Sequence, residues 1–274
     1  MNPFRDSLAC VTGGSSGIGL AIARRLAAHG ARIVLIARTP ERLSAARADI
    51  VSLVPDASVE TVALDVTDQA AVRQATAVIT AQWGDPRFLF NCAGDALPGQ
   101  FDGYPRADLH RMMAVNLEGT WNVTQALVDA LRRTRGHVVN VSSLAGLVGT
   151  TGYTAYAASK FAVVGFSEAL RNELAVDGVR VSVLCPGDTD TPQLAAEQAH
   201  KPPETAALSA RARVLSPDQV AKVCLSGVRA GRFMILAGGD AQLIVWLKRF
   251  APWMLFRTMD RVVLRARRKT RSAP

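Results

Sequence analysis

The sequence predicts an α/β fold in which a parallel sheet of about seven strands carries helices on both faces. Short apolar runs rich in β-branched residues alternate along the chain with longer segments of helical pattern. The runs are apolar throughout, as expected of strands that are buried on both faces. Because crossovers between parallel strands are right-handed, this alternation favours a doubly wound, Rossmann-like arrangement.

Seven apolar runs are predicted as strands, at residues 8–12, 31–37, 58–64, 88–91, 137–141, 179–184 and 233–237. Helix-length segments separate the first six of them, at residues 18–29, 40–53, 68–83, 106–134 and 154–176. With no internal repeat or linker, we expect one catalytic domain over residues 1–240. The polar, alanine-rich segment 193–216 follows a strand, which predicts a substrate lid or, as the alternative, a pair of surface helices.

Composition excludes several classes of protein. The chain has 274 residues, of which 49% are hydrophobic and 20% charged, as in ordinary globular domains. Most of the net charge of +9 comes from the segment after Leu247, where nine basic residues accompany only Asp260. The main domain is therefore close to neutral, and we expect no nucleic-acid partner. The four cysteines have no metal-ligand spacing, so we expect free thiols in a reducing cytosol and no metal.

A glycine-rich loop links the first strand to the first helix. The loop is predicted to bind the pyrophosphate of a dinucleotide, because glycines allow close approach and the helix N-terminus offers amide donors. The residues expected to take part are Gly13, Ser15, Ser16, Gly17, Ile18 and Gly19.

The end of the second strand indicates which nucleotide binds. Sites for NAD commonly place a carboxylate there to bind the ribose 2′-hydroxyl. Here the strand ends in Arg38, and Arg42 follows one helical turn later. A guanidinium suits a 2′-phosphate, so we expect NADPH, with a solvated arginine as the alternative. Asp65 after the third strand and the Asn91-Cys92-Ala93-Gly94 run after the fourth lie at the same predicted edge.

A second group of residues has the side chains that acid–base catalysis requires. Tyr156 and Lys160 are four residues apart in a helical segment and so share one face. A neighbouring ammonium is expected to lower the pKa of the phenol. Tyr153 lacks such a partner, because Ala157 follows it at the same spacing. Ser143 directly follows the fifth strand, and its hydroxyl can polarise a carbonyl oxygen.

These motifs together make residues 7–240 resemble the short-chain dehydrogenase/reductase superfamily. The resemblance implies that Tyr156 is the acid–base catalyst, that Lys160 tunes it and contacts the nicotinamide ribose, and that Ser143 orients the substrate carbonyl. It also implies that Asn116 supports a proton relay through water. Cys92 departs from the pattern, since many members have asparagine there. The further cofactor contacts that the resemblance implies are Val66, Asn91, Ala93, Gly94, Pro186, Gly187, Thr189 and Thr191.

The predicted substrate class comes from a resemblance to one narrower family within this superfamily. The Asp188-Thr189-Asp190-Thr191-Pro192 run, with the later Lys201-Pro202 and Glu204-Thr205 pairs, looks like that of 3-ketodihydrosphingosine reductases, and so does the 216–222 run, although Gly187 stands where the eukaryotic members have proline. The resemblance implies reduction of the long-chain ketone 3-ketosphinganine to sphinganine. Another lipophilic ketone, such as a 3-ketoacyl thioester or a steroid, remains open. So does a non-catalytic NADP(H)-binding membrane scaffold, although such a protein would not need the catalytic residues.

The last part of the chain, residues 241–274, is predicted to be a tail that associates with a membrane. Leu255, Met259, Val262, Val263 and Ala266 fall on one side of a helical wheel, and the arginines fall on the other. A basic amphipathic helix suits an anionic lipid surface. Packing at the protein's own dimer interface is the alternative. We expect a cytoplasmic protein held peripherally at the cytoplasmic face of a membrane. The superfamily resemblance implies a homodimer or homotetramer.

Overall fold

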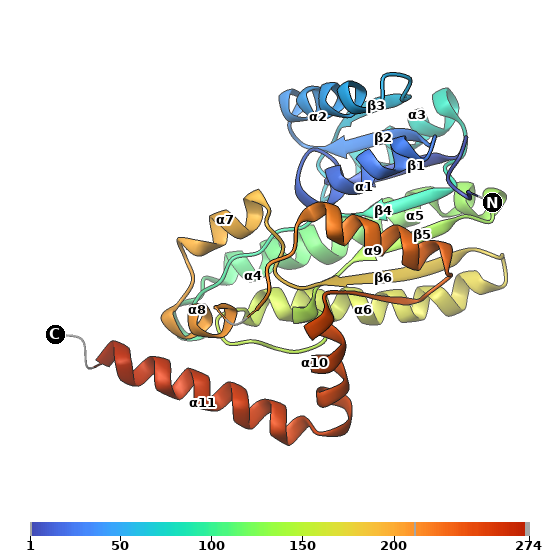
Figure 1. Ribbon diagram of the computed structural model, residues 1–274. Coiled ribbons are helices and arrows are strands. Elements are labelled where there is room, and N and C mark those ends of the chain that lie inside the picture. Colours follow the sequence, from blue (N-terminus) through green and yellow to red (C-terminus); the bar gives the residue numbers. More distant parts are fainter. Residues whose placement is uncertain (1, 211, 272–274) are drawn as a thin grey trace.

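The computed structural model describes residues 2–210 and 212–271. Seven strands form one sheet in the order β3-β2-β1-β4-β5-β6-β7, and every neighbouring pair is parallel (Figure 1). The strands are β1 (Leu8–Thr12), β2 (Arg32–Ala37), β3 (Val59–Ala63), β4 (Phe88–Asn91), β5 (His137–Val141), β6 (Arg180–Pro186) and β7 (Met234–Ala237). The predicted doubly wound sheet is confirmed, with the order reversing between β1 and β4.

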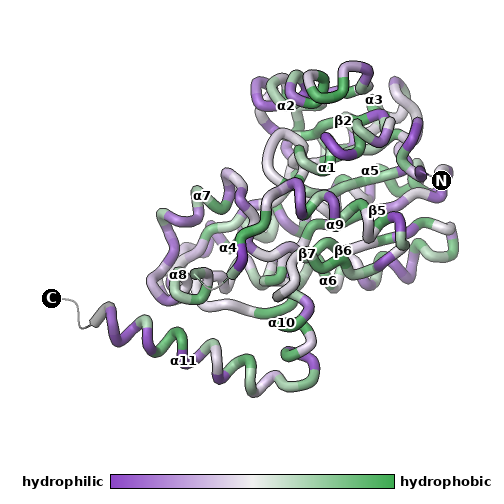
Figure 2. The backbone as a smooth tube through the Cα atoms, in the orientation of Figure 1, coloured by the Kyte–Doolittle hydropathy of each residue, from purple (hydrophilic) through white to green (hydrophobic). Residues whose placement is uncertain are grey.

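Helices cover both faces of the sheet. One face carries α1 (Gly17–Ala28), α2 (Pro40–Leu53) and α9 (Pro217–Arg229), and the other carries α3 (Gln69–Trp83), α5 (Gly119–Thr134) and α6 (Thr154–Ala175). Successive strand residues point to opposite layers: Ala9 and Val11 pack under α1, whereas Leu8 and Cys10 pack on the other side. Burial on both faces explains the apolar sequences of inner strands such as β2, which is green in Figure 2, whereas the edge strand β3 is partly exposed and contains Glu60 and Thr61.

Two helical predictions need correction. The single segment predicted at 106–134 is divided into α4 (Arg106–Met113), a π-helical turn over Ala114–Glu118 and α5. The helix α9 is missing from the predicted segments, although Ser216 and Gln219 form a capping box at its start and its buried side packs on the sheet.

The segment predicted as a lid contains two short helices, α7 (Pro192–Gln198) and α8 (Pro203–Ser209). After β7 come α10 (Gly239–Phe250) and α11 (Pro252–Arg271), which extend below the sheet in Figure 1. Residue 211 of the predicted lid and residues 272–274 of the predicted tail lie outside the described residues. Among the described helices, none combines the length and apolar character that crossing a bilayer requires.

The apolar stripe of α11 faces the protein. Leu255, Met259, Val263 and Ala266 are partly buried and Val262 is buried, and the helix packs against α8. Apart from Leu264, the large apolar side chains that α10 and α11 leave exposed lie near the bend between these two helices. We call this set the apolar elbow: Leu243, Trp246, Phe250, Trp253, Met254 and Phe256.

Candidate active site

A cavity of about 950 Å³ lies at the carboxyl ends of the strands, where doubly wound sheets bind their ligands. Most residues predicted for the site line it, from the glycine-rich loop at one end to Tyr156 and beyond. The predicted residues on its wall are Gly13, Ser15, Ser16, Gly17, Ile18, Gly19, Arg38, Arg42, Asp65, Val66, Ala93, Gly94, Ser143, Tyr156, Lys160, Pro186, Gly187, Thr189 and Thr191.

The glycine-rich loop is shaped to receive a ligand against its main chain. A Cβ at Gly13, which has φ +63°, would lie 2.8 Å from the carbonyl oxygen of Cys92, and a Cβ at Gly19 would collide with the Gly13 carbonyl. Ser16 precedes α1 but makes no side-chain capping bond, so the first amides of that helix are left for a ligand. These residues fit a dinucleotide pyrophosphate.

The adenosine end of the cavity is basic on one side. Arg38 follows β2, Arg42 lies in the first turn of α2, and both are exposed on the cavity wall. Asp65 also lines this end, but its carboxylate already accepts hydrogen bonds from the amide and hydroxyl of Thr67, at 2.9 and 2.8 Å.

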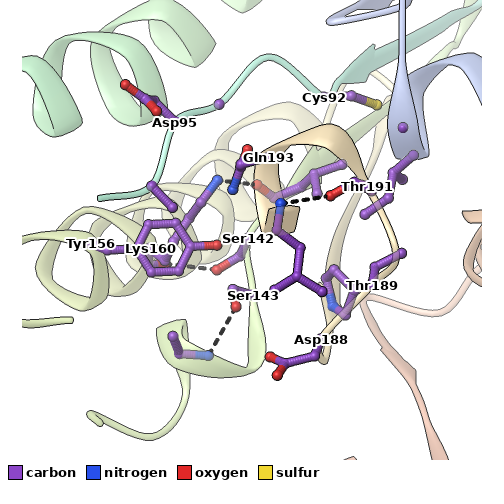
Figure 3. Close-up of a pocket in the computed structure, with 18 of the residues that line it drawn as sticks. Cys92, Asp95, Ser142, Ser143, Tyr156, Lys160, Asp188, Thr189, Thr191 and Gln193 are labelled. Carbon is purple, nitrogen blue, oxygen red and sulfur yellow. Dashed lines mark hydrogen bonds between the residues drawn. The ribbon is translucent and has the colours of Figure 1, made fainter. Parts of the chain in front are cut away.

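Tyr156, Lys160 and Ser143 come together in the middle of the cavity (Figure 3). Helix α6 presents Tyr156 and Lys160 from consecutive turns, and Ser143 follows β5. The Lys160 side chain is buried, and its ammonium donates to the Val141 carbonyl at 3.0 Å. The Ser143 hydroxyl oxygen accepts from the Ala145 amide at 3.1 Å, and the same hydroxyl makes a hydrogen bond with Tyr156.

The pKa shifts correct one expectation from the sequence. Burial raises the pKa of Tyr156, and a hydrogen bond with Ser143 lowers it in part. Burial lowers the pKa of Lys160 to about 8. Desolvation of both groups therefore outweighs the expected effect of the ammonium on the phenol. Tyr156 is consequently a neutral phenol at pH 7 and can donate a proton.

Asn116 and Asn91 lie behind the cavity wall. The Asn116 amide, in the π-helical turn, donates to the Asp95 carbonyl at 2.9 Å and to the Ser159 hydroxyl at 2.8 Å. A Cβ at Gly94 would lie 3.1 Å from Asn116 Oδ1 and 3.3 Å from Lys160 Nζ, so these three residues are neighbours. Asn116 thus anchors the loop after β4 beside Lys160.

Asn91, at the end of β4, is turned away from the cavity. Its side chain donates to the Thr124 hydroxyl and to Asn140 Oδ1, each at 2.9 Å. A contact with a nucleotide at this position would have to come from the main chain.

The loop after β6 closes the cavity opposite the glycine-rich loop. Thr191 caps α7 by accepting from the Leu194 amide at 3.2 Å, and its methyl group would lie 3.1 Å from a Cβ at Gly17. Thr189 donates to the Gly187 carbonyl at 2.9 Å. Pro186 and Gly187 therefore bring this loop against the start of α1.

The predicted site omits two acidic residues that line one side of the cavity. Asp188 and Glu197 both line the cavity, and both carboxylates raise the pKa of Tyr156. Glu197 is buried on α7 and accepts from the Tyr153 hydroxyl at 2.5 Å and from Gln193 at 3.1 Å. The likeness of the 188–192 run to a reductase family includes Asp188 without assigning it a role, and Glu197 lies outside that run.

The cysteines are free. Cys10, Cys185 and Cys224 are buried, whereas Cys92 is partly exposed and lines the cavity. Burial raises the pKa of the Cys92 thiol to about 12, so the thiol is protonated and unreactive at neutral pH.

Comparisons with known proteins agree with this geometry. Residues 7–202 match the family model described as short chain dehydrogenase. A 3-dehydrosphinganine reductase of Arabidopsis thaliana is 36% identical over 85% of this chain and 70% of its own length. A 3-ketodihydrosphingosine reductase of Mus musculus is 37% identical over 85% and 72%. A solved short chain dehydrogenase/reductase from Burkholderia phymatum, in complex with NAD, superposes with a TM-score of 0.81 at 27% identity, covering 91% of this chain and 95% of its own.

Proposed function

The chain belongs to the short chain dehydrogenase family and is an oxidoreductase, and on that premise we propose that it reduces the ketone of 3-ketosphinganine to sphinganine with NADPH. The observation that carries this proposal is the continuity of one cavity. The cavity runs from the glycine-rich loop and Arg38, past Ser143, Tyr156 and Lys160, to a carboxylate and an apolar end.

The residues around Tyr156 suit reduction of a ketone. When bound, NADPH supplies the hydride that reaches the ketone carbon. The neutral Tyr156 phenol donates a proton to the ketone oxygen. The Ser143 hydroxyl, which is hydrogen-bonded to Tyr156 in the structure, donates to that oxygen and holds it in place when the ketone is bound. Lys160 holds the nicotinamide ribose. Asn116 keeps the loop after β4 beside Lys160 and supports a water-mediated proton path.

The preference for NADPH rests on Arg38 and Arg42. Both guanidinium groups are exposed at the end of the cavity where a ribose 2′-phosphate would lie, and Arg38 occupies the position at which NAD sites commonly have a carboxylate. The pyrophosphate is assigned to Gly13, Ser15, Ser16, Gly17, Ile18 and Gly19, and further contacts to Asp65, Val66, Ala93, Gly94, Pro186, Gly187, Thr189 and Thr191.

A sphingoid ketone is supported by the acidic side of the cavity. 3-Ketosphinganine carries an ammonium on the carbon next to its ketone. Within the described residues, the Asp188 carboxylate makes no hydrogen bond or ion pair, and it acts on Tyr156 through its charge. An ammonium bound to Asp188 would bring the adjacent ketone to Tyr156. A 3-ketoacyl thioester or a steroid has no cationic group next to its ketone that would pair with this carboxylate.

Membrane association of the predicted tail, residues 241–274, is supported by the apolar elbow rather than by the stripe of α11. Trp246, Phe250 and Trp253 are each more than half exposed. Arg249 lies over the Phe250 ring and Arg257 over the Trp253 ring, each at 5.9 Å. Aromatic side chains flanked by arginines suit the boundary of an anionic membrane. We place the protein peripherally at the cytoplasmic face, where a lipid ketone could be taken up.

Assembly into a homodimer or homotetramer is supported by an apolar outer surface on α5 and α6. Trp121 of α5 is half exposed, and its ring lies 5.2 Å from that of Phe166 on α6. A second copy of the chain would cover this aromatic pair.

The test is NADPH oxidation with 3-ketosphinganine in mixed micelles, with NADH and a soluble 3-ketoacyl thioester as comparators. Turnover of the sphingoid ketone well above that of the thioester supports the proposal. Turnover of the thioester or of a steroid ketone alone would overturn the substrate and keep the chemistry. Tight binding of NADPH without turnover of any ketone would instead indicate a nucleotide-binding scaffold.

A further inference from the structure

The end of the cavity farthest from the glycine-rich loop is apolar. Its wall there includes Leu208 of α8, Ile244 of α10, and Leu255 and Met259 of α11. None of these residues falls within the 7–202 match to the short chain dehydrogenase family. The helices that follow the last strand therefore complete a cavity whose other parts the family fold supplies.

Specific contacts hold these helices against the body of the protein. Helix α11 packs on α8, where the buried Glu204 accepts from Arg267 at 3.0 Å and from Gln100 at 3.2 Å. Helix α10 is held by Lys248, which donates to the Leu147 carbonyl and lies 4.6 Å from the centre of the Phe161 ring. Leu255 and Met259 are consequently fixed in the cavity wall.

We propose that α10 and α11 form the binding wall for the alkyl chain of the substrate, with Leu255 and Met259 setting the preference for long chains. The occupant follows from continuity, because this apolar wall bounds the same cavity as Tyr156 and Ser143. The cavity, at about 950 Å³, is at the upper end of the range for small-molecule sites, which leaves room for a chain beside a nucleotide. The inference rests on the proposed function only in requiring an alkyl ketone.

If α10 and α11 bind the alkyl chain, kcat/KM should depend on the length of that chain. Each methylene that moves from water onto an apolar wall raises affinity about fourfold. For the native enzyme, kcat/KM should therefore rise with each added carbon until the chain fills the apolar end. The rise should be visible with ketones that stay monomeric in detergent-free buffer, which removes any effect of membrane binding by the apolar elbow.

The experiment measures kcat/KM for NADPH-dependent reduction of straight-chain 3-ketones of increasing length. Met259→Trp, which fills the apolar end, should lower kcat/KM for the longest ketones at least tenfold and leave the shortest within twofold. Leu264→Trp is the matched control, since Leu264 lies on the same helix with its side chain 56% exposed, and it should match the native enzyme at every length. Met259→Ala, which adds no bulk, should flatten the dependence on length.

A second readout does not depend on turnover. Dissociation constants of the same ketones, measured by titration calorimetry on full-length protein saturated with NADP⁺, should show the same dependence and the same loss in Met259→Trp. Equal losses at all lengths, or no change in either Met259 variant, would overturn the inference. Failure of the proposed function is distinguishable, because it would appear as a wrong preference for the head group while the dependence on chain length persisted.

Discussion

The Lys160 ammonium lies 5.7 Å from the centre of the Tyr156 ring and makes its hydrogen bond to the Val141 carbonyl. The pair therefore shares a buried environment without a direct bond to the phenol oxygen. Burial raises the pKa of Tyr156 and lowers the pKa of Lys160 to about 8. A buried, neutral phenol is the protonation state that a donor to a ketone oxygen requires.

Tyr156→Phe should abolish most of the reduction while leaving nucleotide binding intact. Losing a general acid typically costs 10²- to 10⁴-fold in rate, so we expect kcat to fall by about that factor. Tyr153→Phe is the matched control, because the Tyr153 hydroxyl donates to Glu197 and its ring lies 5.6 Å from that of Tyr156. Stopped-flow kinetics and NADPH titration check both variants. Full turnover by Tyr156→Phe would rule out this residue as the proton donor.

Arg38→Ala should weaken selection of the phosphorylated nucleotide. Removing a charge-assisted contact to a 2′-phosphate should raise KM for NADPH about 10- to 100-fold and leave KM for NADH within about threefold. Steady-state kinetics with both nucleotides gives the ratio. An unchanged preference for NADPH in this variant would show that Arg38 is a solvated surface residue.

Asp188→Asn should discriminate between substrates by their amine. The change removes a charge and keeps the size of the side chain, so kcat/KM for 3-ketosphinganine should fall about 10- to 100-fold. The corresponding long-chain ketone without the amine should be reduced as well by the variant as by the native enzyme. An equal fall for both ketones would mean that Asp188 acts on Tyr156 rather than on the substrate.

Acid should destabilise the fold through His137. Burial lowers the pKa of His137 to about 4 from an ordinary value of 6.5, and the ring lies 2.7 Å from the Ser182 hydroxyl. Because the unfolded chain binds the proton more readily, stability is present above pH 6.5 and is lost as the pH falls toward 4. Denaturant unfolding should give a loss of about 2 kcal/mol between pH 7 and pH 5 from this residue. His137→Gln should show a shallower slope over the same interval, and an identical slope would contradict the assignment.

The apolar elbow should drive membrane binding. Replacing Trp246 and Trp253 with serine should weaken co-sedimentation with vesicles that contain anionic lipid by about tenfold for each tryptophan. Phe101→Ser is the control, because Phe101 is also an exposed aromatic residue but lies outside α10 and α11. Added salt should weaken binding further through Arg249 and Arg257. Unchanged binding by the double variant would remove the elbow from the membrane surface.

The sheet was predictable because burial on both faces leaves a continuous apolar pattern, and each strand end then brings its polar residues to one edge. This reasoning predicts one site for Gly13, Arg38 and Ser143, and the family resemblance adds Tyr156 of α6; all four line the same cavity. The pKa of Tyr156 was not predictable, since it depends on desolvation by residues that are distant in sequence.

The tail, residues 241–274, shows a second limit of prediction from the sequence. An amphipathic pattern indicates that one side of a helix is covered, but it does not say whether protein or lipid covers it. In α11 the covered side faces α8 and the cavity, whereas the apolar side chains left for a membrane lie on either side of Pro252.

The order of the parts along the chain has a consequence for how specificity could change. The glycine-rich loop, Arg38, Arg42 and Tyr156 all precede α7, whereas four apolar residues of the cavity wall follow it: Leu208, Ile244, Leu255 and Met259. Exchanging the segment from α8 onward with that of another member of the family should change which apolar group of the substrate the enzyme prefers. The machinery for hydride transfer would stay intact, so a chimaera joined after α7 should be an active enzyme of altered substrate range.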